Sequence, residues 1–183
     1  MIKTGLFGGS FNPIHNGHIS LARQLREKAG LDEVWLMVSP QNPLKASSSL
    51  LDDDTRLAMA RLAVEDQEGI VACDYEMQLP KPSYTWNTLQ ALSQDYPDRE
   101  FVLMIGGDNW ELFDKWYHAD DIRKNYQIIV YPRRGAQGGF EDLDLIDISS
   151  TEIRQLIQAG KSINHLVPQA VAEYIKNHKL YAK

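Results

Sequence analysis

The sequence predicts an α/β fold built on a mainly parallel sheet. Short apolar runs rich in β-branched and aromatic residues alternate with segments of helical periodicity along the 183 residues. Units of strand, helix and strand form right-handed crossovers, so their strands lie parallel. The length is enough for one hydrophobic core, and we expect residues 1–183 to form a single domain.

Six apolar runs are predicted as strands, because each is short and rich in the residues that suit a pleated, half-buried surface. In chain order these runs are Thr4–Phe7, Glu33–Val38, Ile70–Cys73, Glu100–Ile105, Gln127–Tyr131 and Leu143–Asp147.

Five segments are predicted as helices from their apolar stripes and their start signals. In the first, Ile19, Ala22 and Leu25 share one face. The acidic triplet at 52–54 favours the start of the second, and a proline opens the last. In chain order the helices are Gly17–Lys28, Asp53–Val64, Thr85–Ser93, Ser150–Gln158 and Pro168–Asn177.

Composition and charge exclude several classes of protein. The chain is 43% hydrophobic and 24% charged, and its apolar runs are far shorter than the roughly 20 residues that span a bilayer. Its net charge of −6 argues against a general nucleic-acid surface. Cys73 is the single cysteine, which excludes an internal disulfide. We therefore expect a cytoplasmic protein with no leader segment, no membrane contact and no nucleic-acid partner.

The first site candidate is the glycine-rich turn "GLFGGSFNPIHNGHISLA", which begins at Gly5. It follows the first predicted strand, and open α/β sheets bind ligands beyond the carboxyl ends of their strands. A helix begins near Asn16 or Gly17, and its N-terminus favours an anion. His15 and His18 are three residues apart at that terminus, so both rings can donate to one phosphate group.

Two other interpretations of this turn stay open. The histidines are also consistent with an ordinary glycine and proline turn, or with a two-histidine metal site, although no third ligand lies nearby in the sequence. Gly8 and Gly9 fit neither the G-x-G-x-x-G pattern nor a Walker A loop.

A second motif, "DISSTEIR", covers Asp147 to Arg154. Ser149 or Ser150 is predicted as a helix N-cap, with Glu152 completing a capping box. Capping does not explain Arg154, which lies one turn inside the helix beside a second anion-binding terminus. Two donor-rich helix starts and an arginine suit a polyphosphate better than a single phosphate.

These motifs carry a family resemblance. "GSFNPIHNGH" and "ISSTEIR" resemble the two signatures of the nucleotidyltransferase superfamily. Four more stretches, in order along the whole chain, make it similar to the nicotinate-nucleotide adenylyltransferase family, whose members join ATP and nicotinate mononucleotide. These stretches are "SPQNPLK" ending at Lys45, "SYTWNTL" from Ser83, "IGGDN" from Ile105 and "DKWY" ending at Tyr117.

The resemblance implies a Rossmann-like, doubly wound fold with helices on both faces of the sheet. It implies catalytic contacts to the ATP phosphates from His15, His18 and Arg154. The residues that it implies for the rest of ATP are Gly8, Gly9, Ser10, Phe11, Ile105, Gly107, Asp108 and Ser150. Those that it implies for nicotinate mononucleotide are Asn42, Lys45, Thr85, Trp116, Tyr117 and Arg133.

Several of these residues have an equally simple structural interpretation. Trp116 is consistent with a core or rim position, and Lys45 with a solvated loop. Asp108 and the Thr85 hydroxyl are each consistent with a helix cap.

The implied reaction needs no general base, because the attacking phosphate is already an anion. It needs two anions held together and donors for the leaving pyrophosphate. We expect Mg²⁺ to be carried by the substrate phosphates, with no metal ligands from protein side chains. The rival functions are an adenylyltransferase with another acceptor, such as nicotinamide mononucleotide or phosphopantetheine, and an ATP-binding sensor without turnover.

Overall fold

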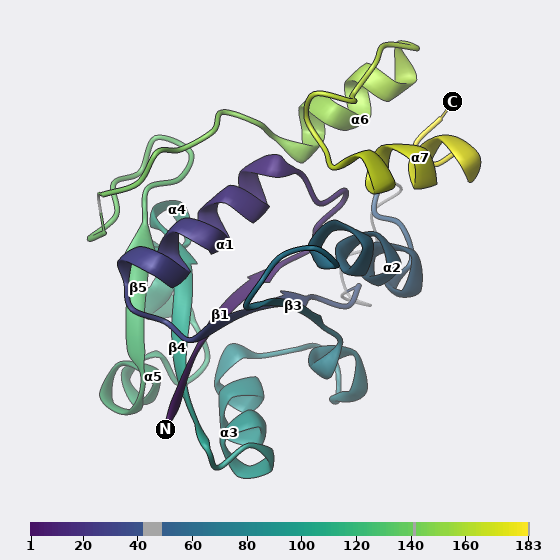
Figure 1. Ribbon diagram of the computed structural model, residues 1–183. Helices are drawn as coiled ribbons and strands as arrows, with labels where there is room; N and C mark the ends of the chain where they lie inside the picture. The colour runs from purple at the N-terminus through teal and green to yellow at the C-terminus, as the bar shows by residue number, and fades with distance from the viewer. Residues whose placement is uncertain (42–48, 141, 183) are drawn as a thin grey trace.

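The computed structural model describes residues 1–41, 49–140 and 142–182, and its centre is a five-stranded parallel sheet (Figure 1). The strand order is β3-β2-β1-β4-β5, with every neighbouring pair parallel. The strands are β1 (Ile2–Gly9), β2 (Glu33–Val38), β3 (Ile70–Cys73), β4 (Arg99–Gly106) and β5 (Gln127–Tyr131). The parallel sheet and five of the six predicted strands are confirmed.

Seven α-helices and two short 3₁₀ helices accompany the sheet in the described residues. The five predicted helices are α1 (Asn16–Lys28), α2 (Asp53–Val64), α3 (Thr85–Asp95), α6 (Ser150–Gln158) and α7 (Gln169–Asn177). The five predicted helices did not include α4 (Gly107–Trp110), where only a helix start near Asn109 was anticipated, nor α5 (Ala119–Asn125), η1 (Tyr75–Gln78) or η2 (Phe113–Lys115). These four are too short to carry a full apolar stripe, so periodicity cannot identify them.

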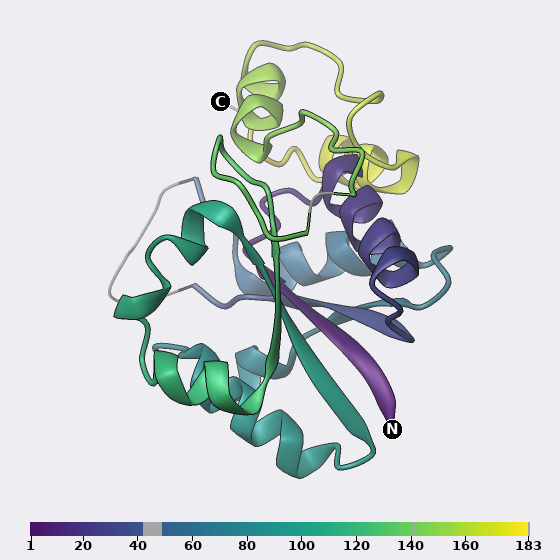
Figure 2. The same cartoon turned by 90° about the vertical axis from the view of Figure 1, so that its left-hand side faces the viewer.

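Helices cover both faces of the sheet, which confirms the doubly wound fold. Figure 2 shows α1 on one side of the sheet, with α3 and α5 on the other. Side chains alternate accordingly along β1: Phe7 packs into the cluster with α1, α2, α6 and α7, and Leu6 into the cluster with α3 and α5. This two-sided burial explains why the strands read as continuous apolar runs.

The prediction of a sixth strand at Leu143–Asp147 is wrong. This segment runs across α1 towards α6 and pairs with no described strand (Figure 1). Its backbone is held by a side chain instead: Asp144 donates its N–H to Gln24 Oε1 at 2.8 Å and accepts from Gln24 Nε2 at 2.8 Å. Leu145 and Ile146 are about half exposed. The mixture of apolar residues and aspartates in this segment is a strand-like pattern, but the segment does not pair with an edge of the described sheet.

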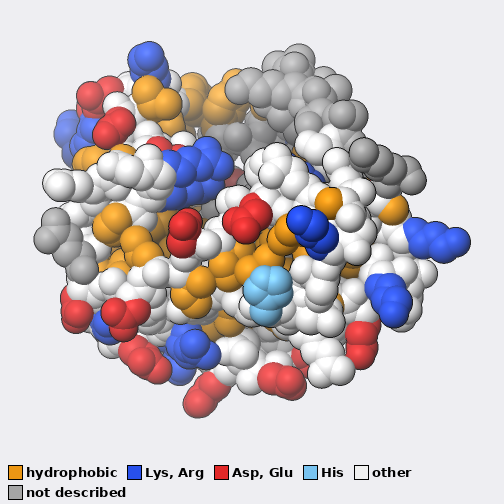
Figure 3. Space-filling model, turned by 90° about the horizontal axis from the view of Figure 1, so that it is seen from above, with side chains coloured by type: hydrophobic (Ala, Val, Ile, Leu, Met, Phe, Trp, Pro, Cys, Tyr) orange, Lys and Arg blue, Asp and Glu red, His pale blue; other side chains and the backbone are white. Residues whose placement is uncertain are grey.

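β1 and β4 are neighbours in the sheet, but the chain leaves them in opposite directions: from β1 it passes through α1 to β2, and from β4 it passes through α5 to β5. This switch point is where open α/β sheets form ligand crevices. Seen from above, acidic and basic side chains alternate on the described surface around a band of hydrophobic side chains (Figure 3). Among the described residues, no helix is both long and apolar enough to cross a bilayer.

Candidate active site

The turn after β1 is held in place by a buried arginine from α2. The Arg56 side chain is 0% exposed, and its Nη1 donates to the Ser10 carbonyl at 2.8 Å and to the Ser39 carbonyl at 2.7 Å. Arg56 Nε donates to the Leu51 carbonyl at 2.8 Å, and Nη2 pairs with Asp53 at 2.6 Å. The loops that follow β1 and β2 are therefore fixed relative to each other at the carboxyl end of the sheet.

The two predicted histidines stack at the start of α1, with ring centroids 3.7 Å apart. His15 is the N-cap, and its Nδ1 accepts from the Gly17 N–H at 3.0 Å. His18 Nδ1 accepts from the His15 N–H at 3.1 Å. Because each Nδ1 is an acceptor, each neutral ring carries its proton on Nε2. The two side chains thus cap the start of α1, which the sequence analysis did not anticipate, and each ring still carries an Nε2–H donor.

Burial keeps both histidines neutral. It lowers the pKa of His15 to about 4, with the nearby charge of Arg133 adding to the effect. Burial, followed by His15 and Arg133, holds the pKa of His18 well below its usual value. At neutral pH the pair therefore consists of uncharged hydrogen-bond donors. Phe11, at a positive φ of 48°, packs its buried ring against His18 with centroids 4.9 Å apart.

The start of α6 reaches the same turn from the far end of the chain. Ser149 is the N-cap and accepts from the Glu152 N–H at 3.1 Å, as one of the two serines was predicted to do. Ser150 Oγ donates to the Pro13 carbonyl at 2.9 Å, and Arg154 Nη1 to the Asn12 carbonyl at 2.8 Å. The two sequence motifs are therefore in direct contact, although the pairs that join them are separated by 137 and 142 residues.

A cavity of about 320 Å³ lies at the carboxyl ends of β1 and β4. Four of the residues implied for ATP line this cavity: Gly8, Gly9, Ser10 and Ile105. From those implied for nicotinate mononucleotide it is lined by Thr85, Trp116 and Arg133. One cavity thus joins the two predicted half-sites.

Asp108 and Gly107 lie at the start of α4, beside this cavity. Asp108 Oδ1 is buried and has no hydrogen-bond partner among the described residues, while Oδ2 is 3.9 Å from Arg133 Nε and 3.7 Å from Arg134 Nη1. A Cβ on Gly107 would lie 2.5 Å from the Gln137 carbonyl oxygen, so the loop after β5 packs directly on this residue. Arg133, which was predicted for nicotinate mononucleotide, therefore lies next to Asp108, which was predicted for ATP, and it lines the cavity.

The start of α3 lies at the cavity, which Thr85 lines, and in the described part of the chain its N-cap residue makes no side-chain capping bond. Tyr84 is the N-cap residue and offers no side-chain hydrogen bond, and Thr85 is the first helical residue, which removes the capping interpretation of its hydroxyl. The half-exposed Tyr117 ring lies 5.0 Å from Tyr84. Trp116 packs on Phe113 at 5.0 Å and still lines the cavity. The predictions for Asn42 and Lys45 fall outside the described residues.

Motif analysis missed three polar residues that line the cavity: Ser39, Glu76 and Asn109. Glu76 lies on η1, in a segment with no motif of its own, so nothing local in the sequence marks it. Asn109 is the last residue of the "IGGDN" stretch, and its place in that motif could have identified it as a site residue.

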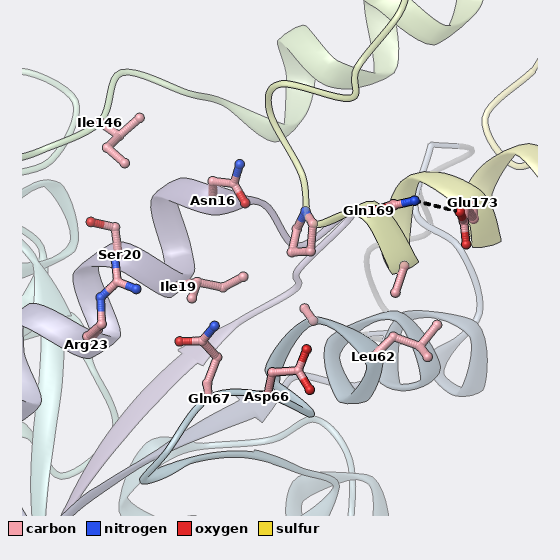
Figure 4. A pocket seen from close by; sticks show the side chains of 13 residues that line it. Asn16, Ile19, Ser20, Arg23, Leu62, Asp66, Gln67, Ile146, Gln169 and Glu173 are labelled. Carbon is pink, nitrogen blue, oxygen red and sulfur yellow. Dashed lines mark hydrogen bonds between the residues drawn. The ribbon is translucent and has the colours of Figure 1, made fainter.

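A second cavity, of about 510 Å³, lies between α1, α2 and α7 (Figure 4). Arg23, Asp66 and Glu173 are its charged lining residues. None of the predicted site residues that the structure describes lines it. The smaller cavity is lined by seven of them, whereas His15, His18 and Arg154 lie at the adjoining turn and are not among its lining residues.

Comparison with known proteins gives the family. Residues 6–156 match the model of the cytidylyltransferase-like family. A relative from Bacteroides thetaiotaomicron, named as a nicotinate-nucleotide adenylyltransferase, is 46% identical over 97% of this chain and 92% of its own. The chain belongs to the nicotinate-nucleotide adenylyltransferase family.

Other members of the nicotinate-nucleotide adenylyltransferase family agree with this placement. A Bacillus pumilus relative of the same name is 38% identical over 99% of both chains. A crystal structure from Vibrio parahaemolyticus, named as the same enzyme, aligns over 99% of this chain and 96% of its own with a TM-score of 0.76 and 26% identity. A Plasmodium falciparum nicotinic acid mononucleotide adenylyltransferase has the same fold, with a TM-score of 0.73 at 17% identity, over 99% and 98% of the two chains.

Proposed function

We propose that this protein transfers the adenylyl group of ATP to nicotinate mononucleotide, releasing pyrophosphate and forming nicotinate adenine dinucleotide for NAD biosynthesis. The observation that carries the proposal is the pair of stacked, neutral histidines on the turn whose Gly8, Gly9 and Ser10 line the cavity with residues of both predicted half-sites. Membership of the family supplies the reaction. The single cysteine agrees with a cytoplasmic location.

The protonation of the histidines fits this reaction. The phosphate of the mononucleotide is already an anion and attacks the α-phosphorus directly, so no base and no covalent enzyme intermediate are needed. His15 and His18 then serve as Nε2–H donors to the ATP phosphates, where negative charge grows as pyrophosphate leaves. Arg154 and the N-terminus of α1 add positive potential at the same turn.

Mg²⁺ is proposed to enter with ATP as part of the substrate. Among the described residues, no group of three or more His, Cys, Asp or Glu side chains is placed to hold a metal ion. The Nδ1 atoms of His15 and His18 are already engaged with backbone N–H groups, and their Nε2 atoms carry protons. Oxygen ligands from phosphates and water are the ones that Mg²⁺ prefers.

The acceptor half-site suits a flat ring that carries a carboxylate. Among the described residues, no N-cap side chain satisfies the first N–H groups of α3, which begins at Thr85, and such a helix N-terminus attracts an anion. Trp116 lines the same cavity and offers an aromatic face for the pyridine ring. The buried, unpartnered Asp108 Oδ1 on the other side is available to an adenosine hydroxyl or amino group.

The test is Mg²⁺-dependent pyrophosphate release from ATP with four acceptors in parallel: nicotinate mononucleotide, nicotinamide mononucleotide, phosphopantetheine and none. We expect the fastest release with the nicotinate compound. Faster release with another acceptor would reassign the substrate. ATP binding without release on any acceptor would make the protein a sensor.

We predict that Trp116→Ala raises the KM for nicotinate mononucleotide about 5-fold to 150-fold, since stacking on an aromatic ring contributes about 1–3 kcal/mol per base. The KM for ATP should stay nearly constant. Steady-state kinetics with each substrate varied in turn measure both values. Trp110→Ala is the matched control, because Trp110 packs on the same Phe113 ring at 5.0 Å but does not line the cavity. A change in the KM for ATP alone would refute the assignment of Trp116 to the pyridine ring.

We predict that Gly8→Leu lowers kcat/KM about 5-fold to 150-fold, because forcing atoms into an occupied site costs about 1–3 kcal/mol. A Cβ on Gly8 meets no atom of the described residues within 4 Å, and the residue shares the face of β1 that carries Leu6, which also lines the cavity. The thermal unfolding midpoint should stay unchanged. Gly139→Leu is the control, since that Cβ also meets nothing within 4 Å, away from the cavity. Normal kinetics in Gly8→Leu would place the ligands elsewhere.

A further inference from the structure

Glu76 is a buried carboxylate that the proposed chemistry does not use. It lies on η1, beyond the carboxyl end of β3, and only 9% of Glu76 is exposed to solvent. It lines the same cavity as Thr85 and Trp116, and it is the acidic residue among those that line it. A carboxylate is an unexpected group here, because both proposed substrates carry negative phosphates.

Among the described residues, Glu76 has hydrogen-bond donors but no counter-ion for its charge. Thr88 Oγ1 donates to Oε2 at 2.8 Å, and Ser39 Oγ lies 3.4 Å from Oε1. In the described part of the chain, no lysine, arginine or histidine nitrogen lies within 4.0 Å of it. Arg133 lines the same cavity but is directed to Asp108. Burial without a cation raises the pKa of the Glu76 carboxyl, so the site favours a ligand that brings positive charge.

The hydrogen bonds of Glu76 do not by themselves require a charged acid. Two hydroxyl donors occupy two of the lone-pair positions of the carboxylate, and a glutamine oxygen would accept from one of them equally well. The Thr88 hydroxyl also lies 3.2 Å from the Tyr84 carbonyl oxygen, which offers an alternative acceptor. An anion at this position therefore serves something other than the fold.

We propose that Glu76 is the counter-charge for the pyridinium ring of the acceptor and a specificity-determining residue for it. This inference rests on the proposed function. In an oxidised pyridine mononucleotide the ring nitrogen bonded to ribose carries a fixed positive charge. A ring stacked on Trp116 lies in the cavity that Glu76 lines, so the carboxylate and the aromatic face both attract that charge. The N-terminus of α3 then binds the carboxylate substituent of the ring, and Glu76 favours the oxidised, positively charged ring over the uncharged dihydro ring.

The test compares nicotinate mononucleotide with its 1,4-dihydro form, which has the same substituents and an uncharged ring. Dissociation constants are measured by titration calorimetry for the wild type and for Glu76→Gln, Glu76→Asp and Thr88→Val. The wild type should bind the oxidised form at least about 10-fold more tightly. Glu76→Gln should weaken binding of the oxidised form about 10-fold to 100-fold, leave the dihydro form and ATP nearly unchanged, and abolish the preference.

The other two variants separate charge from packing. Glu76→Asp keeps the charge and should keep a preference for the oxidised ring. Thr88→Val removes a hydrogen bond without changing charge and should also keep it. Equal weakening of both ligands in Glu76→Gln, or loss of the preference in Thr88→Val, would overturn the proposal.

Two further results keep the test decisive. A wild type without preference between the two rings would refute the role of Glu76 even if Glu76→Gln did not fold. Wild-type pyrophosphate release with nicotinate mononucleotide separates the two proposals. Release combined with an unchanged preference in Glu76→Gln refutes only the role of Glu76, whereas no release refutes the proposed function.

Discussion

Replacing His18 with alanine is expected to lower kcat about 10²-fold to 10³-fold, the usual consequence of losing one preorganised donor to a developing negative charge. The ring is fixed for this role by its stacking on His15 at 3.7 Å and by the hydrogen bond that engages its Nδ1. Pyrophosphate release at saturating substrates measures the effect. The KM values should change less than kcat, because the interaction strengthens in the transition state.

The control for this variant is His165→Ala, since His165 is exposed and lies outside the cavity. Its kinetics should match the wild type. The far-ultraviolet circular dichroism of His18→Ala should also match, because the variant frees one N–H at a helix terminus, at a cost of about 1 kcal/mol. An enzyme without His18 that keeps wild-type kcat would refute the donor role.

The largest expected change in stability comes from Arg56→Met. The methionine retains apolar bulk but leaves the carbonyls of Ser10, Ser39 and Leu51 without their donor and Asp53 without its buried partner. Breaking such a pair by removing one member costs about 3–5 kcal/mol. For a chain of this size the unfolding midpoint should fall by roughly 6–20 °C, at about 2–4 °C per kcal/mol. Differential scanning calorimetry measures the shift.

Arg61→Met on the same helix is the matched control for that experiment. Its side chain is 59% exposed, and it pairs with Asp74 at 3.5 Å, which is a surface ion pair. Such pairs contribute about 0–1 kcal/mol, so its midpoint should move by only a few degrees. Equal shifts in the two variants would show that Arg56 does not hold the loops after β1 and β2.

The sequence predicted those parts of the site that depend on local signals. Start signals placed the beginning of α1 at Asn16 or Gly17 and the N-cap of α6 at Ser149 or Ser150, and the structure has Asn16 and Ser149. The apolar runs located five strands within a few residues. The prediction failed at Leu143–Asp147, where a strand-like alternation has no sheet edge to join and is held by Gln24. Periodicity describes which faces are apolar, and it does not say what covers them.

The amino-acid sequence by itself therefore determined the α/β class, the helix starts and the two donor-rich motifs, because each depends on neighbours within about one turn of chain. Only the tertiary structure decided that Arg154 contacts Asn12, that Arg133 lies beside Asp108, and that Glu76 enters the cavity. Those contacts join residues far apart in the chain. They follow from the order of the strands and the packing of helices on the sheet, which no local pattern encodes.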